Sequence, residues 1–295
     1  NYYVNDNSIT GDIYCSAGGN EANSGLSPGA PKRTLTNVLT LYDLKPDDIV
    51  YIDAGTYAEG STAGGTEITS DDCGDSGGYV TLIGKTNSTF FNGGSTRQKC
   101  LYLTGDYIKV KDIDAKRASA LMGATGIFIT GSHCMVSNCG IYSNVGTMLG
   151  RGIFINNNNN TEILNNNIWG NGDLGGININ SSHTNTISRN SCYTQPYGIN
   201  AMNSKYCTYT SNRVRRNIIA GIYINQNCTG SIIASNICFS NYGSYGNLYV
   251  VELATACSTN LRIYDNYCYA GMQSACGMRL TGMVGGSVSN NRIYG

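Results

Sequence analysis

A short apolar motif recurs along the chain from residue 126 onward, at intervals of 22–29 residues. It reads Gly-Ile-x-Ile or a degenerate form of it, and it begins at Gly126, Gly152, Gly176, Gly198, Gly221, Leu248 and Gly277. A second motif follows each copy: VSNCGIY from Val136, ILNNNIW from Ile163, ISRNSCY from Ile187, YTSNRVR from Tyr209, IASNICF from Ile233, IYDNYCY from Ile263 and VSNNRIY from Val288. Self-similarity at this period indicates a solenoid of stacked coils.

Each repeat holds two short stretches in which apolar residues alternate with polar ones, and such stretches are too short to be stable alone. Stacked about 4.8 Å apart, equivalent strands of successive coils pair in parallel and bury their apolar side chains in one column. The sixth position of the second motif predicts such an inward column: Ile141, Ile168, Cys192, Val214, Cys238, Cys268 and Ile293. The pattern therefore predicts an all-β fold, a right-handed parallel β-helix.

The fourth position of the second motif is almost always asparagine. It reads Cys139, Asn166, Asn190, Asn212, Asn236, Asn266 and Asn291. Asparagine tolerates the left-handed backbone conformation of a turn, and stacked amides can hydrogen bond to the coils above and below. We therefore interpret this column as a structural ladder rather than as a ligand site.

The repeats resemble those of the parallel β-helix family of secreted bacterial proteins, which is similar to pectate lyase. The resemblance covers roughly residues 100–295. The leader, with YYVN from Tyr2 and DDIVYIDAGTY from Asp47, resembles the N-terminal cap and first coil of large secreted β-helix proteins, some of them polysaccharide lyases. It implies one elongated domain, with a cap and leader at residues 1–46 and coils at residues 47–295.

A short amphipathic helix is expected within the leader, at residues 34–43. Leu35, Val38, Leu39 and Tyr42 follow the i, i+3, i+4, i+7 spacing of a helix with one apolar face. Such a helix would lie across the open N-terminal end of the solenoid and cover its core.

Composition excludes several classes of protein. No apolar run approaches the 18–20 or so residues that span a bilayer. The 19 Lys and Arg balance the 19 Asp and Glu, whereas binding to nucleic acid phosphates requires a basic excess. The 12 cysteines contain no CxxC spacing, which argues against zinc or an iron–sulfur cluster and favours an oxidising compartment. We expect an extracellular protein, secreted or at the cell surface, with several disulfides.

The column positions divide the cysteines into two groups. Cys192 and Cys238 lie two coils apart, about 9–10 Å, which is beyond the reach of a disulfide, so Cys192 is expected to be reduced and buried. Cys207, Cys228 and Cys257 lie in the turns of successive coils and are better placed to form a bridge.

The family resemblance implies contact with carbohydrate, through lyases, epimerases, hydrolases or non-catalytic surface proteins. A lyase of this architecture would need a Lys or Arg base, together with carboxylates that hold calcium against an acidic sugar. The candidate bases are Lys109, Lys111, Lys116 and Arg117, interleaved with Asp112 and Asp114. A solvated outer face with internal ion pairs is the favoured interpretation of this segment.

A second candidate is a basic patch that would bind an acidic polysaccharide, formed by Arg189, Arg213 and Arg215. The seventh position of the second motif adds a nearly aromatic column: Tyr142, Trp169, Tyr193, Arg215, Phe239, Tyr269 and Tyr294. An outward column would offer ring faces to sugars, as we expect for Trp169 and Tyr193 if they bind carbohydrate. An inward column would be core, and this arrangement is favoured.

Metal candidates are few. Asp71, Asp72 and Asp75 lie in one Gly-rich loop whose oxygen ligands would suit calcium, although the spacing matches neither an EF-hand nor the nonapeptide calcium repeat. His133 and His183 stand in different coils with unlike neighbours, which gives no support to a histidine metal site. Calcium is the one cofactor that the sequence suggests.

Two functions remain open. The regular repeats with short connections favour a structural or adhesive protein of an extracellular assembly, and the alternative is a polysaccharide lyase. Residues 1–173 hold 17 acids and 11 bases, a net charge of −6, and residues 174–295 hold 2 acids and 8 bases, a net charge of +6. A rod with opposite charges at its two ends favours head-to-tail self-association into a filament. The alternative is a longer chain whose further coils cover the C-terminal end.

Overall fold

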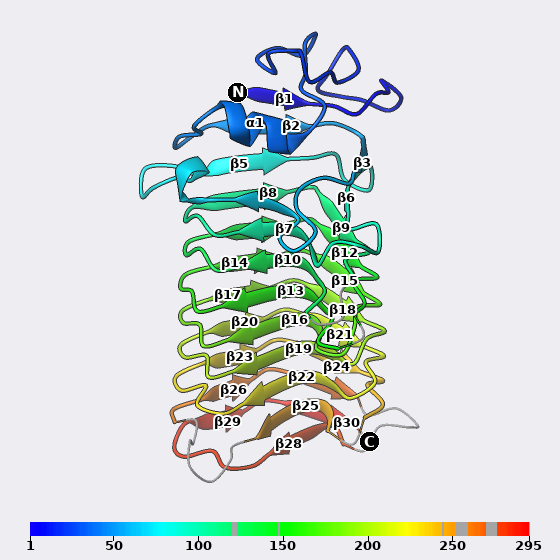
Figure 1. The fold of residues 1–295 in the computed structure, drawn as a ribbon. Helices are drawn as coiled ribbons and strands as arrows, with labels where there is room; N and C mark the ends of the chain where they lie inside the picture. Colours follow the sequence, from blue (N-terminus) through cyan, green and yellow to red (C-terminus); the bar gives the residue numbers. More distant parts are fainter. Residues whose placement is uncertain (120–122, 147, 244, 252–258, 270–275, 295) are drawn as a thin grey trace.

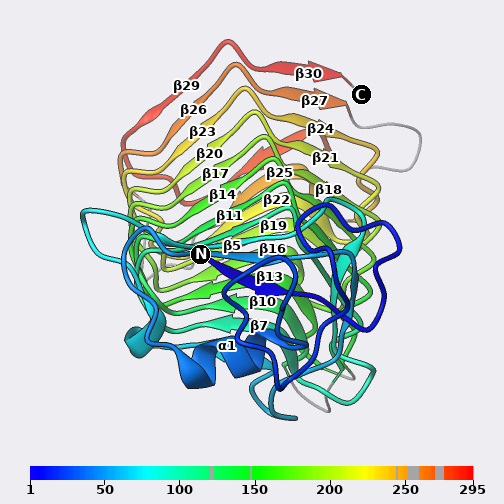
Figure 2. The ribbon, with the colours of Figure 1, turned by 90° about the horizontal axis from the view of Figure 1, so that it is seen from above.

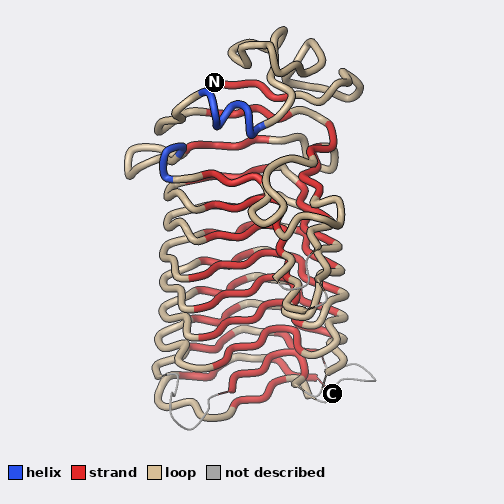
Figure 3. The backbone as a smooth tube through the Cα atoms, viewed as in Figure 1, coloured by secondary structure: helices blue, strands red, loops and turns tan. Residues whose placement is uncertain are grey.

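The chain winds into a tall stack of coils, and each coil contributes one strand to each of three parallel sheets (Figures 1 and 3). The computed structural model describes residues 1–119, 123–146, 148–243, 245–251, 259–269 and 276–294. All strand pairs of these ranges are parallel and join one coil to the next. The predicted right-handed parallel β-helix is confirmed. No helix within the described ranges is long and apolar enough to cross a membrane.

Sheets A, B and C follow one another around each coil. Sheet A contains β1 (Tyr2–Val4), β2 (Ile49–Ile52), β5 (Val80–Ile83), β8 (Ile108–Lys111), β11 (Met135–Ser137), β14 (Glu162–Leu164), β17 (Thr186–Ser188), β20 (Thr208–Thr210), β23 (Ile232–Ala234), β26 (Arg262–Tyr264) and β29 (Ser287–Ser289). Sheet B contains β3 (Gly55–Tyr57), β6 (Thr89–Asn92), β9 (Asp114–Lys116), β12 (Gly140–Tyr142), β15 (Asn167–Trp169), β18 (Ser191–Tyr193), β21 (Arg213–Arg215), β24 (Ile237–Phe239), β27 (Tyr267–Tyr269) and β30 (Arg292–Tyr294). Sheet C contains β4 (Thr66–Ile68), β7 (Lys99–Leu103), β10 (Thr125–Ile129), β13 (Arg151–Asn156), β16 (Gly175–Asn180), β19 (Tyr197–Met202), β22 (Ala220–Asn225), β25 (Gly246–Val251) and β28 (Met278–Leu280).

The core lies between the three sheets and is built from single-file columns. The column predicted from the sixth motif position is in register from Ile141 to Ile293. Its members are fully buried from Ile141 to Cys268, whereas Ile293 in the last coil is 52% exposed. Period-2 alternation thus sends one residue of each short strand into the core and its neighbours to the surface.

The asparagine column lies at the corner between sheets A and B and forms a continuous hydrogen-bonded ladder. Asn166 Oδ1 accepts the Cys139 N–H at 2.9 Å, and Asn190 Oδ1 accepts both the backbone N–H and the Nδ2 of Asn166, at 2.9 and 3.0 Å. The pattern continues through Asn212 to Asn291. The left-handed residue of each turn is the one before the ladder residue, not the ladder asparagine itself.

A second amide ladder, which neither repeated motif predicted, lies at the corner between sheets B and C. Asn144 donates from Nδ2 to Asn171 at 3.0 Å, and Asn171 donates in turn to Gln195 at 3.1 Å. Asn217 continues the same column in the next coil through Asn241. Buried backbone groups at both corners therefore find partners in side-chain amides, as polar groups without access to water require.

The leader closes the N-terminal end (Figure 2). The predicted helix is confirmed as α1 (Leu35–Leu41), which buries Leu35 and Val38. It packs on β1 and β4, so it covers the first edge of sheet C. Asp53 is fully buried and anchors the loop between β1 and α1. Its carboxylate accepts the N–H groups of residues 13–15 at 2.7–2.9 Å. A single turn of 3-10 helix follows β4 at Ser70–Asp72.

The expectation of several disulfides is wrong for the described residues, in which no cysteine pair is bridged. The stacking of the coils explains why the expected disulfides are absent. Most of the cysteines occupy inward positions of their own coils and pack there as small core residues. Cys192 is a fully buried free thiol, as predicted, and burial raises the pKa of its thiol. Cys207 is also a buried free thiol, and Cys257, the third cysteine expected to form a bridge, lies outside the described residues.

Candidate functional site

The corner between sheets A and B carries one left-handed residue in each coil. Asp112, Asn138, Asn165 and Arg189 occupy this position with φ of 58°, 56°, 57° and 57°. Asparagine and aspartate adopt this conformation more readily than most other residues, because their short polar side chains bond locally. Each such residue directs the following one inward to the ladder. The left-handed residues line the outside of the corner, and Asn138, Asn165 and Arg189 are exposed there.

A groove of about 400 Å³ opens at this corner, next to the column formed by the first residue of each of the strands β9, β12 and β15. It is lined by Thr86, Asn87, Asp112, Asp114, Asn138, Cys139, Gly140, Asn165, Asn167 and Trp169. Gly140 creates room for its acidic neighbour: a Cβ there would lie 2.6 Å from Asp114 Oδ1. We call this cavity the corner groove.

Asp114 is the buried acid of the corner groove. It begins β9, is 4% exposed, and accepts the Gly140 N–H at 2.8 Å. Burial raises the pKa of this carboxyl above its ordinary value, although the hydrogen bond from Gly140 and the charge of Lys116 act in the opposite direction. A carboxyl group that retains its proton more readily than usual is suited to general acid–base chemistry.

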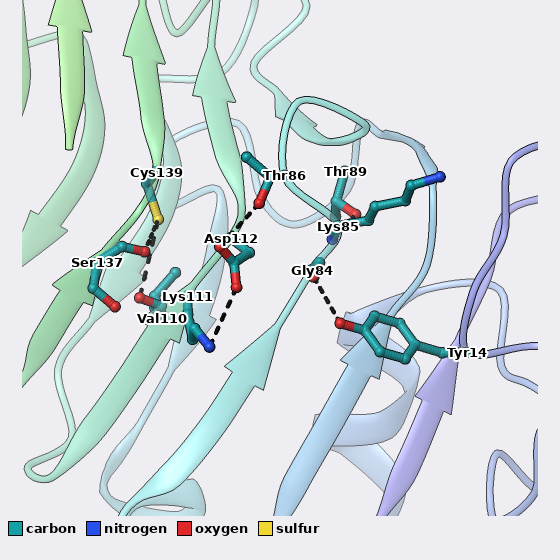
Figure 4. A network of polar contacts seen from close by, with 10 residues as sticks. All are labelled: Tyr14, Gly84, Lys85, Thr86, Thr89, Val110, Lys111, Asp112, Ser137 and Cys139. Carbon is teal, nitrogen blue, oxygen red and sulfur yellow. Dashed lines mark hydrogen bonds and ion pairs between the residues drawn. The ribbon is translucent and has the colours of Figure 1, made fainter. Parts of the chain in front are cut away.

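Asp112 is held by its neighbours on two sides (Figure 4). Thr86 of the preceding coil donates from Oγ1 to Asp112 Oδ1 at 2.9 Å, and Lys111 Nζ lies 3.5 Å from Asp112 Oδ2. In the following coil, the Cys139 thiol donates to the Ser137 carbonyl at 3.2 Å. The two acids of the groove therefore differ: Asp112 is paired with a cation, and Asp114 is buried against a backbone N–H.

Replacing Asp114 by asparagine should stabilise the protein at neutral pH. The folded protein binds the Asp114 proton more tightly than the unfolded chain does, so the stability this group contributes is present below its unfolded pKa, near 3.9, and is lost as pH rises through the folded pKa. At neutral pH the ionised side chain therefore opposes folding, while the neutral amide of asparagine can still accept the Gly140 N–H. Thermal unfolding followed between about pH 7 and about pH 3 should give Asp114→Asn a higher midpoint at neutral pH, with the difference shrinking toward low pH.

A constant difference across that range would contradict the assigned burial cost. Asp112→Asn is the matched control, because Asp112 retains a cationic partner and Asn in its place keeps the left-handed turn.

The four candidate bases do not form one cluster. Lys109 and Lys111 lie on the outer face of sheet A, alternating with buried Ile108 and Val110, and Lys109 Nζ lies 5.4 Å from the Tyr79 ring centroid. Lys116 lies on the outer face of sheet B, where its Nζ is 3.5 Å from the Phe90 ring centroid and burial lowers its pKa. Arg117 is exposed, in a left-handed conformation at the next corner. Lys111 and Lys116 are the two that interact with the acids of the corner groove.

The inward arrangement favoured from the sequence is wrong: the aromatic column lies on the outer face of sheet B, and its rings face one another. The Trp169 ring is parallel to Tyr142 at 4.3 Å and to Tyr193 at 5.9 Å, so both of its faces are covered. Arg215 covers the far face of Tyr193 at 4.4 Å, and Lys116 lies 5.8 Å from Tyr142 at the other end. The stack therefore offers ring edges rather than a platform of ring faces, and Trp169 lines the corner groove.

The three arginines of the predicted basic patch share this side of the molecule but contact different neighbours. Arg189 Nε donates to Asn165 Oδ1 of the preceding coil at 3.0 Å, which places it beside the corner groove. Arg213 lies over the Phe239 ring of the following coil at 5.0 Å, and Arg215 belongs to the aromatic stack. Of the three, Arg189 is the one adjacent to the groove.

The predicted calcium ligands do not converge. Asp71 and Asp72 line a cavity of about 530 Å³ beside α1, and Asp75 is absent from that lining. Asp72 Oδ1 accepts the Leu44 N–H at 3.1 Å, and Asp75 Oδ1 closes its own turn onto the Gly77 N–H at 2.7 Å. Within the described ranges no three His, Cys, Asp or Glu side chains come together in a way that could hold a metal ion. Calcium binding stays a prediction without structural support.

Both acids of the groove were predicted from the sequence, whereas the residues that complete it were not. Asn138, Gly140, Asn165 and Asn167 belong to the second motif or directly precede a ladder position, and the sequence predicted no site role for them. The signal was present in the repeat, because each left-handed residue directly precedes a ladder position. Aligning that position from coil to coil brings Asp112, Asn138 and Asn165 into one line.

The fold and the groove together define an extended parallel β-helix with a polar surface groove built from several coils. A family model described as "Periplasmic copper-binding protein (NosD)" matches residues 61–275, and the chain belongs to this NosD family. No curated protein sequence matches the chain.

Solved structures with a similar fold include three carbohydrate-active enzymes. Pectate lyase Pel9A is 18% identical over 98% of this chain and 78% of its own, with a TM-score of 0.63. An alginate lyase from Paenibacillus sp. str. FPU-7 is 16% identical over 88% of this chain and 95% of its own, with a TM-score of 0.55. A GH136 lacto-N-biosidase from Eubacterium ramulus is 13% identical over 99% of this chain and 67% of its own, with a TM-score of 0.57. At these identities the similarity establishes the fold alone.

Proposed function

We propose that this protein binds a glycan outside the cytoplasm and holds one sugar in the corner groove. The observation that carries the proposal is the lining of the groove, which combines two carboxylates, several amides and the edge of Trp169. Carboxylates accept and amides both donate and accept hydrogen bonds, so together they can satisfy a sugar's hydroxyl groups. An apolar ring edge beside them can contact the C–H groups of the sugar.

Two further points support a glycan ligand. The structures with a similar fold include a pectate lyase, an alginate lyase and a lacto-N-biosidase, all of which act on carbohydrate according to their names. Arg189 stands beside the groove, where its guanidinium can meet an acidic sugar. The family description as periplasmic agrees with a location outside the cytoplasm.

Truncating Trp169 or Arg189 to alanine should weaken glycan binding by about tenfold each, which corresponds to about 1.4 kcal/mol. Affinity electrophoresis in gels that contain polygalacturonate, alginate or a neutral galactan would identify the ligand and give the dissociation constants. Tyr51→Ala is the matched control, because Tyr51 also belongs to an outward aromatic stack, with Tyr3 at 5.4 Å, but lies in the first coil. Equal weakening by all three variants would contradict a site at the corner groove.

Cleavage of the bound glycan is a second candidate function, and one observation favours it. Asp114 and Lys116 both project outward from β9, and burial raises the pKa of the acid while it lowers the pKa of the amine. These shifts bring a proton donor and a proton acceptor closer to neutrality, as acid–base catalysis requires. Incubating the same polysaccharides with the protein, with and without calcium, and recording the absorbance of unsaturated products would detect a lyase. Asp114→Asn should abolish any such activity.

Copper binding, which the family description mentions, has no matching residues in the described ranges. His133 stacks on Tyr107 at 4.4 Å, and His183 Nδ1 lies 3.4 Å from the Lys205 backbone nitrogen, so each ring is engaged separately. No group of three or more candidate ligands forms in those ranges. The donor set described does not fit a copper site, and we derive no role for this metal.

End-to-end self-assembly in a structural or adhesive role stays a prediction, which rests on the opposite net charges of residues 1–173 and 174–295.

A further inference from the structure

The N-terminal end of β13 in sheet C carries an arginine with an unusual environment. The Arg151 guanidinium carbon lies 3.9 Å from the ring centroid of Phe154, an outward residue of the same strand. The Phe154 ring in turn stacks on Phe128 at 4.9 Å, and Phe128 stacks on Tyr102 at the same distance. Arg151 therefore ends a ladder of three rings and is held in place by it.

The stack also determines on which side the guanidinium lies. Phe128 covers one face of the Phe154 ring with the planes 6° apart, so Arg151 occupies the other face, toward β16. Asn178 is the residue of β16 in register with Phe154, and it is 7% exposed although it points outward. The guanidinium thus lies over the Phe154 ring, on the side of the strand that carries Asn178.

No carboxylate of the described chain compensates the charge of Arg151. The residue takes part in none of the ion pairs of the described ranges, and its Nε is buried without an acceptor. Its neighbours in register, Thr125 and Gly175, carry no charge. Burial lowers the pKa of the guanidinium to about 10. Arg151 is partly buried, and a partly desolvated cation without a charged partner carries a cost that a bound anion offsets.

Two other arginines, Arg97 and Arg189, already have protein hydrogen-bond partners. Arg97 donates to the carbonyl groups of Ala58 and Gly60, and Arg189 donates to Asn165. Arg151 keeps the planar set of donors that pairs with a carboxylate or a sulfate through two parallel hydrogen bonds.

We propose that Arg151 is the receptor for the carboxylate or sulfate group of an anionic ligand, with Phe154 and Asn178 fixing the guanidinium on the outer face of sheet C. Further along the same face, Asn156 and Asn180 are joined by a hydrogen bond of 3.0 Å and present neutral amides to the rest of a ligand. This site belongs to a different sheet from the corner groove. The two proposals are therefore independent, and either can fail without the other.

The test uses sodium glucuronate and sodium sulfate as probes, with glucose as the neutral control, at constant ionic strength. The ¹⁵N–¹H signal of Arg151 Nε should shift with one or both anions and stay unchanged with glucose. Arg151→Gln should weaken the apparent affinity at least tenfold, measured by the rise in thermal midpoint with ligand. Arg213→Gln, which removes an exposed arginine of sheet B, should leave it unchanged.

A response to glucuronate alone identifies a carboxylate site, a response to sulfate alone a sulfate site, and a response to both a general anion site. The proposal is overturned if neither anion moves the Arg151 signal, or if Arg151→Gln and Arg213→Gln respond to the probes as the wild type does. Arg151→Lys provides a second variant, because it keeps the charge and loses the planar fork. It should bind more weakly than the wild type and retain the fold.

Discussion

Replacing Gly152 by alanine is expected to destabilise the solenoid by about 3 kcal/mol, because the repeat glycine packs against the backbone of the next coil. A Cβ at Gly152 would lie 2.6 Å from the Gly176 carbonyl oxygen and 2.9 Å from both Asn171 Nδ2 and Ile168 Cγ2. The Gly176 carbonyl cannot retreat, because inter-strand hydrogen bonds hold the coils about 4.8 Å apart. The same contact recurs at each glycine of the first motif between Gly126 and Gly221.

Thermal unfolding followed by far-UV circular dichroism should therefore show a midpoint lower by on the order of 10 °C for Gly152→Ala. Because each coil contacts only its neighbours, a defect in the middle should also broaden the transition or divide it into two. Gly29→Ala is the matched control, since a Cβ there would lie 3.6 Å from Ser16 Oγ, an ordinary contact. Equal stability of the two variants would show that the coils can separate locally at little cost.

Replacing Asn166 by alanine is expected to cost about 4 kcal/mol, because it removes one rung of the buried ladder. The Cys139 N–H loses its acceptor, and the Val136 carbonyl loses a donor at 3.0 Å. Each buried polar group left without a partner costs about 1–3 kcal/mol. Asn190 Oδ1 retains the backbone N–H of Asn166 and loses the side-chain donor.

The neighbouring residue provides the control for this prediction. Asn167 is exposed at the start of β15, so Asn167→Ala should change the unfolding free energy by no more than about 0.5 kcal/mol. Hydrogen exchange gives a second measurement, since the Cys139 amide should lose its protection in Asn166→Ala and keep it in Asn167→Ala. A protected Cys139 amide in both variants would mean that water or a neighbouring group replaces the missing rung.

The fold was predictable because its signals are local and repeated. Alternation within three or four residues determines which side chains enter the core, and the repeat aligns equivalent residues from coil to coil. The column from Ile141 to Ile293 followed from these two patterns, and the position of α1 followed from the helical spacing of its apolar residues. The predicted disulfides are absent from the described residues. Cysteine content indicates a compartment, but it does not show which two sulfur atoms meet. Where a short side chain is needed at every coil, a thiol serves as a small apolar residue.

The candidate sites could be predicted only in part, because their chemistry depends on side-chain direction. The sequence identified Asp112 and Asp114, but not that Gly140 leaves space for the Asp114 carboxylate. It also aligned Tyr142, Trp169 and Tyr193, but not that their rings would stack face to face and leave only edges for a ligand. Rotamers at the surface depend on neighbours one coil away, about 24 residues distant in the chain.

The sequence by itself determined the parallel β-helix, its inward columns and its asparagine ladder, since a period of 22–29 residues with short alternating strands has few other ways to bury its apolar side chains. The tertiary structure alone decided which polar groups meet and which are left without a partner. Asp112 meets Thr86 and Lys111, whereas Arg151 lies partly buried against Phe154 and takes part in no ion pair of the described residues. The physical reason is that charge compensation and burial are properties of contacts between coils, and those contacts exist only once the coils have stacked.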